Sequence, residues 1–195
     1  MRGWLLILMF GSSMLLPAGL AAAADTDFEL FGRDPGQGKA YACYSRSYTR
    51  EHLAAHPDQN VRDMTVFVNS YDDQEGLGRQ YSLTMSVNFR QLKQPFNAYG
   101  GCRPGEGGKQ ALNCGIDCDG GSIGLRVKDH TSILLDIPYG ARVSDDAAEE
   151  EEPGDLPKGA KFGADDKLFR LDRAAMSACL ALADDETKAA LAATP

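Results

Sequence analysis

Two histidines and one aspartate lie at a spacing that suits a metal ion. His52 and His56 are four residues apart in a segment with helical character, which places both imidazoles on one helix face, as in many zinc sites. Asp58 follows closely enough to supply a third ligand. Residue 53 is leucine, so the general base of the zinc proteases is missing. We name His52, His56 and Asp58 as candidate metal ligands. The alternative is an exposed helix whose last histidine lies near the negative helix end.

A G-x-S-x-G pattern around Ser122 is a second candidate for chemistry. In α/β-hydrolases this turn exposes a nucleophilic serine between a strand and a helix. Here an alternating strand follows the serine, and no run of βα units surrounds the motif. The only histidine after the serine is His130. The glycines are explained more simply as residues of a tight turn with positive φ. We therefore assign no catalytic residue and no cofactor.

An acidic stretch that opens at Asp117 resembles a calcium loop. Positions 5 and 12 of an EF-hand loop would be Gly121 and Lys128, which lack the required side-chain oxygen ligands. Calcium bound outside that scheme, with Asp165 or Asp166 as a ligand, is an alternative. A turn braced by a disulfide is the interpretation that we favour.

The five cysteines beyond the N-terminal segment favour disulfides over metal thiolates. They contain no C-x-x-C pair, which argues against zinc and against a thioredoxin-like redox site. We expect Cys102 to pair with Cys114 across a glycine-rich hairpin, a bridge worth about 3 kcal/mol. The other pairings, and the cysteine that stays free, are left open. The disulfide candidates are Cys43, Cys102, Cys114, Cys118 and Cys179.

Residues 1–24 have the pattern of a cleavable export signal. Arg2 gives a positive start, a broken apolar stretch follows, and Ala22–Ala24 supplies small residues before Asp25. The apolar stretch is short for an anchor, because a spanning helix needs about 20 apolar residues. We expect a periplasmic or secreted chain, cut after about Ala24, whose residues 25–195 form one domain that is not anchored in a membrane.

The charge of the chain is concentrated in one segment. The net charge is −8, and the stretch Asp145–Asp155 holds seven acidic residues without a lysine or arginine. A negative surface disfavours nucleic acid as a partner. Residues 145–161 lack periodicity, so we expect an acidic, mobile loop. Its functional alternative is attraction of a cationic partner.

Strict alternation of apolar and polar residues predicts the strands. Tyr81–Phe89 carries five apolar side chains on one face and four small polar ones on the other, as expected for an antiparallel strand with one wet face. Seven further segments show weaker alternation or a suitable length, which gives about eight predicted strands. The others are Lys39–Arg46, Val61–Ser70, Phe96–Gly101, Lys109–Cys114, Ile123–Val127, Ile133–Ile137 and Lys167–Leu171.

The remaining segments are expected to be two helices and a loose arm. Thr49 caps a short helix to His56, and Asp172 caps a C-terminal helix through Leu182, followed by an alanine-rich turn capped at Asp184 or Asp185. Asp25–Gly38 is polar and is expected to be a loose arm. The fold class is therefore mainly β, an antiparallel barrel or sandwich of about eight strands with a short N-terminal helix and a C-terminal helix.

Three segments carry a resemblance to a protein family. HLAAHPDQNV (52–61), CDGG (118–121) and FRLD (169–172) resemble segments of small uncharacterised secreted proteobacterial proteins. That resemblance implies no site. The chain is also similar in class to bacterial inhibitors of C-type lysozyme, with Tyr41-Ala42-Cys43 as the local likeness.

The absence of a convincing catalytic constellation favours a binding role. We expect a monomeric, non-enzymatic binding or interaction module of the periplasm, acting on an unknown protein or small ligand. The first alternative is a metal-binding protein or enzyme that uses His52 and His56. The second is an inhibitor of a cationic secreted enzyme such as lysozyme, acting through the acidic segment. The lipocalin Gly-x-Trp signature is absent, so a ligand-filled calyx is not expected.

Overall fold

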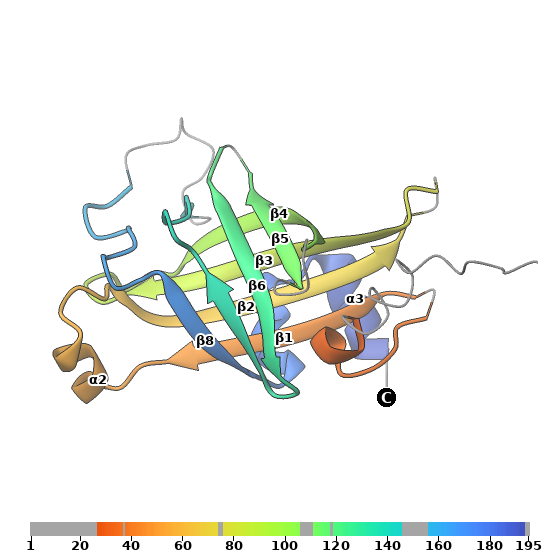
Figure 1. The fold of residues 1–195 in the computed structure, drawn as a ribbon, viewed down its shortest axis with the longest axis horizontal. Coiled ribbons are helices and arrows are strands. Elements are labelled where there is room, and N and C mark those ends of the chain that lie inside the picture. The colour runs from red at the N-terminus through yellow and green to blue at the C-terminus, as the bar shows by residue number, and fades with distance from the viewer. Residues whose placement is uncertain are drawn as a thin grey trace, which may run out of the picture.

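Eight antiparallel strands form a closed barrel in which each strand pairs with its neighbours along the chain and β8 returns to β1 (Figure 1). The computed structural model describes residues 27–36, 38–73, 76–105, 111–117, 119–145 and 156–193. The prediction of about eight antiparallel strands is confirmed, and the architecture is a barrel rather than a sandwich. The strands are β1 (Ala40–Ser47), β2 (Val61–Asp72), β3 (Arg79–Phe89), β4 (Phe96–Pro104), β5 (Leu112–Ile116), β6 (Ser122–Asp129), β7 (Ser132–Asp136) and β8 (Leu168–Arg173).

The alternation of β3 explains why the sheet closes around an apolar core. Its apolar side chains are buried inside the barrel, and its serine, threonine and asparagine side chains lie on the outer face. β2 pairs with β3 in a register that places Val66 opposite Met85 and Val68 opposite Leu83, so apolar side chains meet apolar side chains. Closure leaves each strand paired on both sides, which removes the exposed edges of an open sheet.

Side chains fill the barrel interior. Large residues from successive strands have no more than 1% of their surface exposed and belong to one packed cluster. These buried side chains pack against one another as a core, as in other small eight-stranded barrels. Representative members are Tyr44, Met64, Val66, Leu83, Met85, Phe96, Leu112, Ile123, Leu125, Ile133, Leu135 and Leu171.

A helical turn over residues 27–31 closes one end of the barrel. Leu30 and Phe31 are buried in the core cluster. The Asp27 carboxylate accepts a hydrogen bond from the Tyr81 hydroxyl at 2.8 Å and pairs with the Arg79 guanidinium at 3.0 Å. The expectation of a loose arm over Asp25–Gly38 is therefore wrong for residues 27–31. Arg79 and Tyr81 lie more than fifty residues from Asp27 in the sequence, so the polarity of the N-terminal segment alone cannot predict this arrangement. We call residues 27–31 the plug.

Tyr44 links this plug to the barrel and makes the stability of the fold decrease at alkaline pH. Its hydroxyl donates to the Leu30 carbonyl at 2.6 Å, and burial raises the pKa of Tyr44 to about 12. An unfolded tyrosine ionises near 10, so the folded state binds the extra proton between these values and its stability falls as pH rises above 10. We expect the wild type to lose about 2.5 kcal/mol through this group as pH passes 12.

The measurement is urea unfolding at pH 8, 10 and 11, on wild type and Tyr44→Phe. The variant loses a hydrogen bond and should be less stable at pH 8, but its stability should fall less between pH 10 and 11. A residual alkaline decline is expected from Tyr81, whose pKa burial also raises. Equal slopes in the two proteins would rule out Tyr44 as the titrating group.

Aromatic rings and an asparagine side chain close the opposite end. Phe162 packs edge-on against Phe89 and Phe169, with ring centroids 5.8 and 6.3 Å apart. Asn60 donates its side-chain amide to the carbonyls of Gly159 and Lys161 at 2.8 and 2.7 Å. Within the segment expected to be a mobile acidic loop, residues 146–155 lie outside the described residues, whereas Ala160 is buried in the core.

The short helix α2 (Arg50–Ala55) confirms the expected cap and end. The Thr49 hydroxyl accepts a hydrogen bond from the His52 amide at 3.2 Å, and the helix ends before His56 and Pro57. α2 lies beyond one end of the barrel, on the side away from the 27–31 turn (Figure 1).

The expected helix from Asp172 is wrong in its start and in its type. Asp172 belongs to β8, where it pairs in register with Ser132 and its carboxylate contacts Arg46 at 2.9 Å. Strand pairing with β7 and β1 therefore overrides the capping preference of an aspartate. The helical segment is a 3₁₀ helix, η2 (Met176–Leu182), which packs through Cys179 on the outer face of β1 and β2. Leu180 is 40% exposed, whereas Cys179 is buried.

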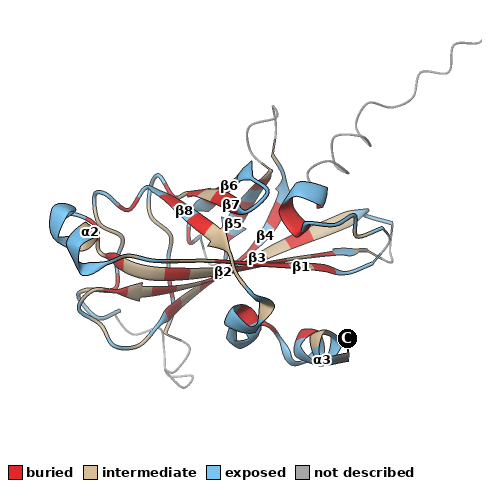
Figure 2. Cartoon of the chain, turned by 90° about the horizontal axis from the view of Figure 1, so that it is seen from below, coloured by how far each residue is buried: buried red, intermediate tan, exposed pale blue. Residues whose placement is uncertain are grey.

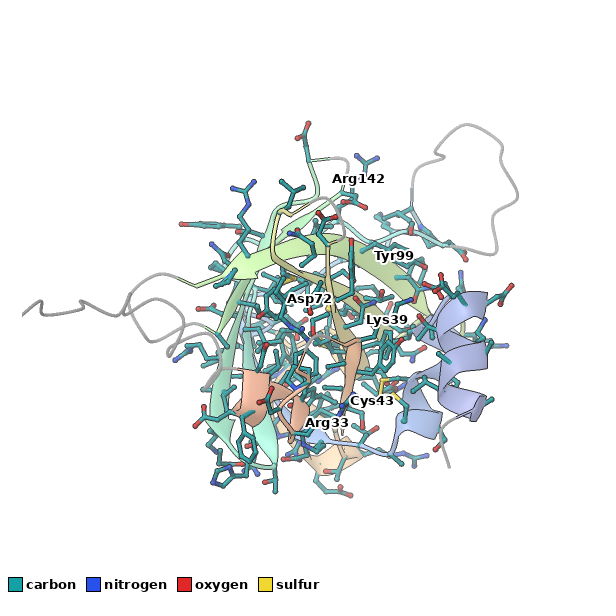
Figure 3. All side chains as sticks on the ribbon, turned by 90° about the vertical axis from the view of Figure 1, so that its right-hand side faces the viewer. Arg33, Lys39, Cys43, Asp72, Tyr99 and Arg142 are labelled. Carbon is teal, nitrogen blue, oxygen red and sulfur yellow. A yellow bond between two sulfur atoms is a disulfide. The ribbon has the colours of Figure 1, made fainter. Side chains whose placement is uncertain are left out.

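A disulfide holds η2 on the barrel. Cys43 on β1 and Cys179 on η2 are bonded across 136 residues of sequence, and the bond faces the helices in Figure 3. The last helix, α3 (Asp185–Ala193), follows η2, and both lie on the same side of the sheet (Figure 2). The Asp184 carboxylate accepts from the Thr187 amide at 2.6 Å, which confirms the expected cap.

The second disulfide confirms the expected pairing of Cys102 with Cys114. These residues are opposite each other on β4 and β5 and belong to the buried wall of the barrel. Cys118 lies outside the described residues. Within the described ranges, no helix combines the length and apolar character required to cross a bilayer.

Candidate functional site

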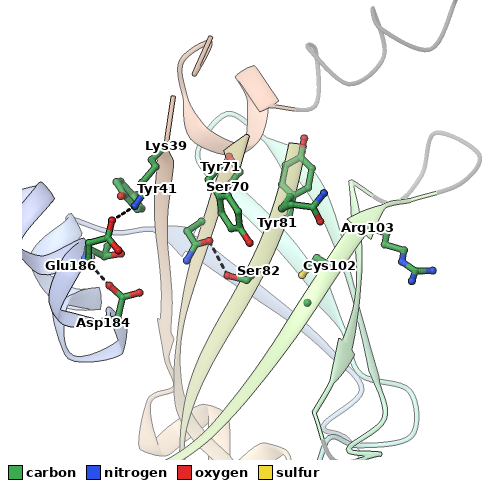
Figure 4. A pocket seen from close by; sticks show the side chains of 14 residues that line it. Lys39, Tyr41, Ser70, Tyr71, Tyr81, Ser82, Cys102, Arg103, Asp184 and Glu186 are labelled. Carbon is green, nitrogen blue, oxygen red and sulfur yellow. Dashed lines mark hydrogen bonds and ion pairs between the residues drawn. The ribbon is translucent and has the colours of Figure 1, made fainter. Parts of the chain in front are cut away.

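A polar hollow of about 660 Å³ lies on the outer face of the barrel, between β1–β4 and α3 (Figure 4). We call it the outer hollow. Lys39, Tyr41 and α3 stand at one side, and Arg103 stands at the other. Because the interior is filled, the outer hollow is the candidate site for a ligand. Its lining residues are Lys39, Tyr41, Asn69, Ser70, Tyr71, Gln80, Tyr81, Ser82, Gly101, Cys102, Arg103, Asp184, Glu186 and Thr187.

Strand register builds the floor of this hollow. Outward-facing residues of neighbouring strands lie next to one another across the sheet. In the row that forms this floor, the residues from β3 onward are serine or glycine. Gly101 and Gly115 leave open space where a side chain would stand, with no atom within 4 Å of an added Cβ. We call this set the cross-strand row. In order from β1 to β6 it is Tyr41, Asn69, Ser82, Gly101, Gly115 and Ser122.

Helix α3 forms one wall and is placed by contacts from distant parts of the chain. Lys39 forms a salt bridge with Glu186 at 2.5 Å, and Thr187 is buried. The Cys43–Cys179 bridge fixes η2, and η2 in turn fixes where α3 begins. Since Lys39 and Glu186 are both well exposed, their pairing alone would hold α3 weakly. The disulfide is therefore the main constraint on this wall.

Three of the four charged side chains that line the outer hollow, those of Lys39, Asp184 and Glu186, are paired or capped. A hydrogen bond to Glu186 raises the pKa of Lys39, and hydrogen bonds from Thr187 lower the pKa of Asp184. Both shifts move the pKa further from 7, so both side chains stay charged near pH 7 and neither is suited to proton transfer there. Most of the other residues that line the outer hollow carry hydroxyls, amides or rings.

Hydrogen bonding within the floor orders its polar groups. The Ser82 hydroxyl donates to the Asn69 side-chain oxygen at 2.8 Å, which leaves the Asn69 amide nitrogen directed as a donor. Tyr41 stacks on Phe67 with ring centroids 5.9 Å apart, and its hydroxyl is buried with no hydrogen-bond partner among the described residues. A buried hydroxyl without a partner carries a free-energy cost that a ligand or water would remove.

The candidate metal ligands lie together in part. His52 and His56 stack face to face with centroids 4.4 Å apart, but His52 hydrogen-bonds Gln59 at 2.9 Å and His56 faces Asp165 at 3.9 Å. Asp58 is exposed, and its backbone oxygen accepts from the Asp165 amide. Within the described ranges, no three His, Cys, Asp or Glu side chains are grouped to hold a metal ion. Metal binding here stays a prediction.

The other motifs are placed as turn and strand residues. Ser122 begins β6, whereas His130 follows its far end, so the two side chains belong to opposite ends of that strand. Gly121 has φ +92°, which confirms the positive φ expected of this turn. The Asp166 carboxylate accepts backbone amide hydrogen bonds at the start of β2.

The residues of the outer hollow were missed from sequence, although one signal pointed toward them. The alternation of β3 places Ser82 outward, which follows from sequence alone. The neighbours of Ser82 depend on strand register, and α3 depends on a remote disulfide, so Tyr41, Gly101 and Glu186 carry no local signature. Comparison with protein-family models, curated proteins and solved structures finds no match.

Proposed function

We propose that this chain is an exported, non-enzymatic binding protein of the bacterial periplasm whose ligand lies in the outer hollow. The observation that carries the proposal is the packing of the barrel. Its interior is filled by side chains, while the outer face of β1–β4 carries a hollow large enough for a ligand. A protein that binds its ligand inside the barrel would instead need an open interior.

Two features support export. The chain begins with the residues expected of a cleavable signal, and two disulfides join Cys43 to Cys179 and Cys102 to Cys114. Disulfides persist in oxidising compartments such as the periplasm. Expression of the full chain in a Gram-negative host, followed by fractionation and mass spectrometry, should give a periplasmic product that begins near Asp25 with both bridges formed. A product retained in the cytoplasm with its first 24 residues intact would rule out export.

Nuclear magnetic resonance tests the binding site. We expect a soluble cell-envelope extract to shift the backbone amide signals of Asn69, Ser82 and Gly101, which lie in the outer hollow, and to leave those of Leu125 and Ile133 unchanged. The two core residues are the internal control, because they are fully buried. Uniform shifts, or none, would contradict a site at the outer hollow.

A further inference from the structure

The lining of the outer hollow has an unusual composition for a protein-binding site. Six of the residues that line it carry hydroxyls and two carry amides, and no aliphatic side chain is among the described residues that line it. Two of the six hydroxyls, those of Ser70 and Tyr81, are buried and bonded to Arg79 and Asp27. A neighbouring hollow between η2 and α3 is the contrast, because Met176, Leu180, Leu191 and Ala192 line it. Peptide and protein partners are usually anchored by apolar side chains in pockets. The outer hollow offers hydrogen bonds and rings instead.

The charges of the outer hollow cancel. Lys39 and Arg103 are cationic, and Asp184 and Glu186 are anionic. Electrostatic recognition of nucleic acid needs a surplus of lysine and arginine, and recognition of a basic partner needs a surplus of acid. A ligand without net charge fits this lining best.

The site is elongated. A second hollow of about 330 Å³ adjoins the first, sharing Gly101 and Arg103 with it and extending over Asn113, Gly115 and Ser122. Together they follow the cross-strand row from β1 to β6. Five spacings of about 4.8 Å give a path of about 24 Å along the curved surface. That path suits a chain of several linked rings laid across the strands.

The closed barrel disfavours an extended peptide as the occupant. A peptide that adds a strand needs an unpaired sheet edge, and each strand here has a neighbour on both sides, although the ladder between β1 and β8 is short and spans only Tyr44 and Ser45 of β1. Where β4 runs past β5, Asn97 pairs with Ser144. Recognition must therefore come from outward side chains.

Tyrosine rings suit the apolar faces of sugars, and amides suit their hydroxyls. Tyr71 is 45% exposed beside the floor, so its ring is open for stacking, while Asn69 and Gln80 present amides nearby. The unpartnered hydroxyl of Tyr41 lies at the α3 side. We infer that the outer hollow and its extension bind a neutral glycan chain across β1–β6. This inference rests on the proposed function, which it deepens by naming the ligand class.

Titration calorimetry with β-1,4-linked N-acetylglucosamine oligomers and with cello-oligosaccharides tests the inference. For at least one series we expect the hexamer to bind about tenfold more tightly than the dimer, because only the hexamer spans the row. Tyr71→Ala should weaken hexamer binding about tenfold, and Tyr71→Phe should keep most of the affinity through its ring.

Gly101→Gln blocks the floor without disturbing the strand, because an added Cβ at Gly101 meets nothing within 4 Å. We expect it to abolish hexamer binding while the melting temperature stays at or above that of the wild type. Ser86→Gln is the matched control. Ser86 lies outward on the same strand as Ser82 but does not line the hollow, so this variant should bind like the wild type.

The outcomes separate the inference from the proposed function. If neither glycan series binds, but envelope extract still shifts Asn69 and Ser82 and protease treatment of the extract removes the shift, the ligand is a peptide or protein. The glycan inference then fails while the binding site stands. If the extract also produces no shift, both proposals fail. Hexamer binding that survives Gly101→Gln places the glycan elsewhere and overturns the inference.

Discussion

Replacing Cys43 and Cys179 together by alanine is expected to lower the free energy of unfolding by about 5 kcal/mol. The bridge closes 136 residues of sequence, and in the chain-entropy model a loop of that length gives about this much stabilisation. That is a large share of the 5–15 kcal/mol that holds a typical domain together. The measurement is guanidinium unfolding followed by circular dichroism, on oxidised wild type and the double variant.

The variant should also loosen one wall of the outer hollow. Cys179 is the buried residue of η2, and with Cys43, Phe67 and Ala183 it forms the small apolar cluster that seats η2 on the barrel. Without the bridge, this cluster and the exposed Lys39–Glu186 pair remain to place α3. We expect faster hydrogen exchange in residues 176–193 than in the strands, under conditions where the barrel is still folded.

The matched control is the other bridge. Cys102 and Cys114 are twelve residues apart, so their replacement by alanine should cost about 3 kcal/mol and leave exchange in η2 and α3 unchanged. Equal losses from the two double variants would show that loop length does not set the contribution of either bridge. Unchanged exchange in residues 176–193 of the Cys43/Cys179 variant would show that packing alone holds η2.

The strands could be predicted because their signal is local. Tyr81–Phe89 alternates strictly, and one face of such a segment must be buried wherever the segment lies in the fold. The plug at residues 27–31 gives no such signal. Its Leu30 carbonyl accepts from Tyr44 and its Asp27 carboxylate is bound by Arg79 and Tyr81, and those contacts exist only after the barrel closes.

The C-terminal segment shows a direct conflict between local and remote preferences. Asp172 is a good helix cap in isolation, but β7 and β1 offer strand partners on both sides. The candidate site has the same dependence on remote pairing. Ser82 is outward by alternation, yet its place beside Gly101 follows from register, and its place near Glu186 follows from the Cys43–Cys179 bridge.

Asp166→Ala is expected to lower the free energy of unfolding by about 4 kcal/mol. Asp166 is fully buried, and one carboxylate oxygen accepts hydrogen bonds from the backbone amides of Asn60, Val61 and Gly163 at 2.7, 3.1 and 2.7 Å. Hydrogen bonds to a charged group contribute about 1.5–3 kcal/mol each, and their loss leaves three amides without an acceptor. Asp166 thus joins the start of β2 to the segment that leads into β8.

Two further variants separate the charge of Asp166 from its shape. Asp166→Asn keeps an acceptor oxygen of the same size and should cost about 2 kcal/mol, because only the charge assistance is lost. Asp165→Ala removes the neighbouring carboxylate, which is half-exposed and 3.9 Å from His56, and should change the stability by less than about 0.5 kcal/mol. Urea unfolding at pH 7 measures all three. If Asp166→Ala is no more damaging than Asp165→Ala, the buried carboxylate does not hold this end of the barrel. The clamp would then be the Asn60 side chain with its two carbonyl acceptors.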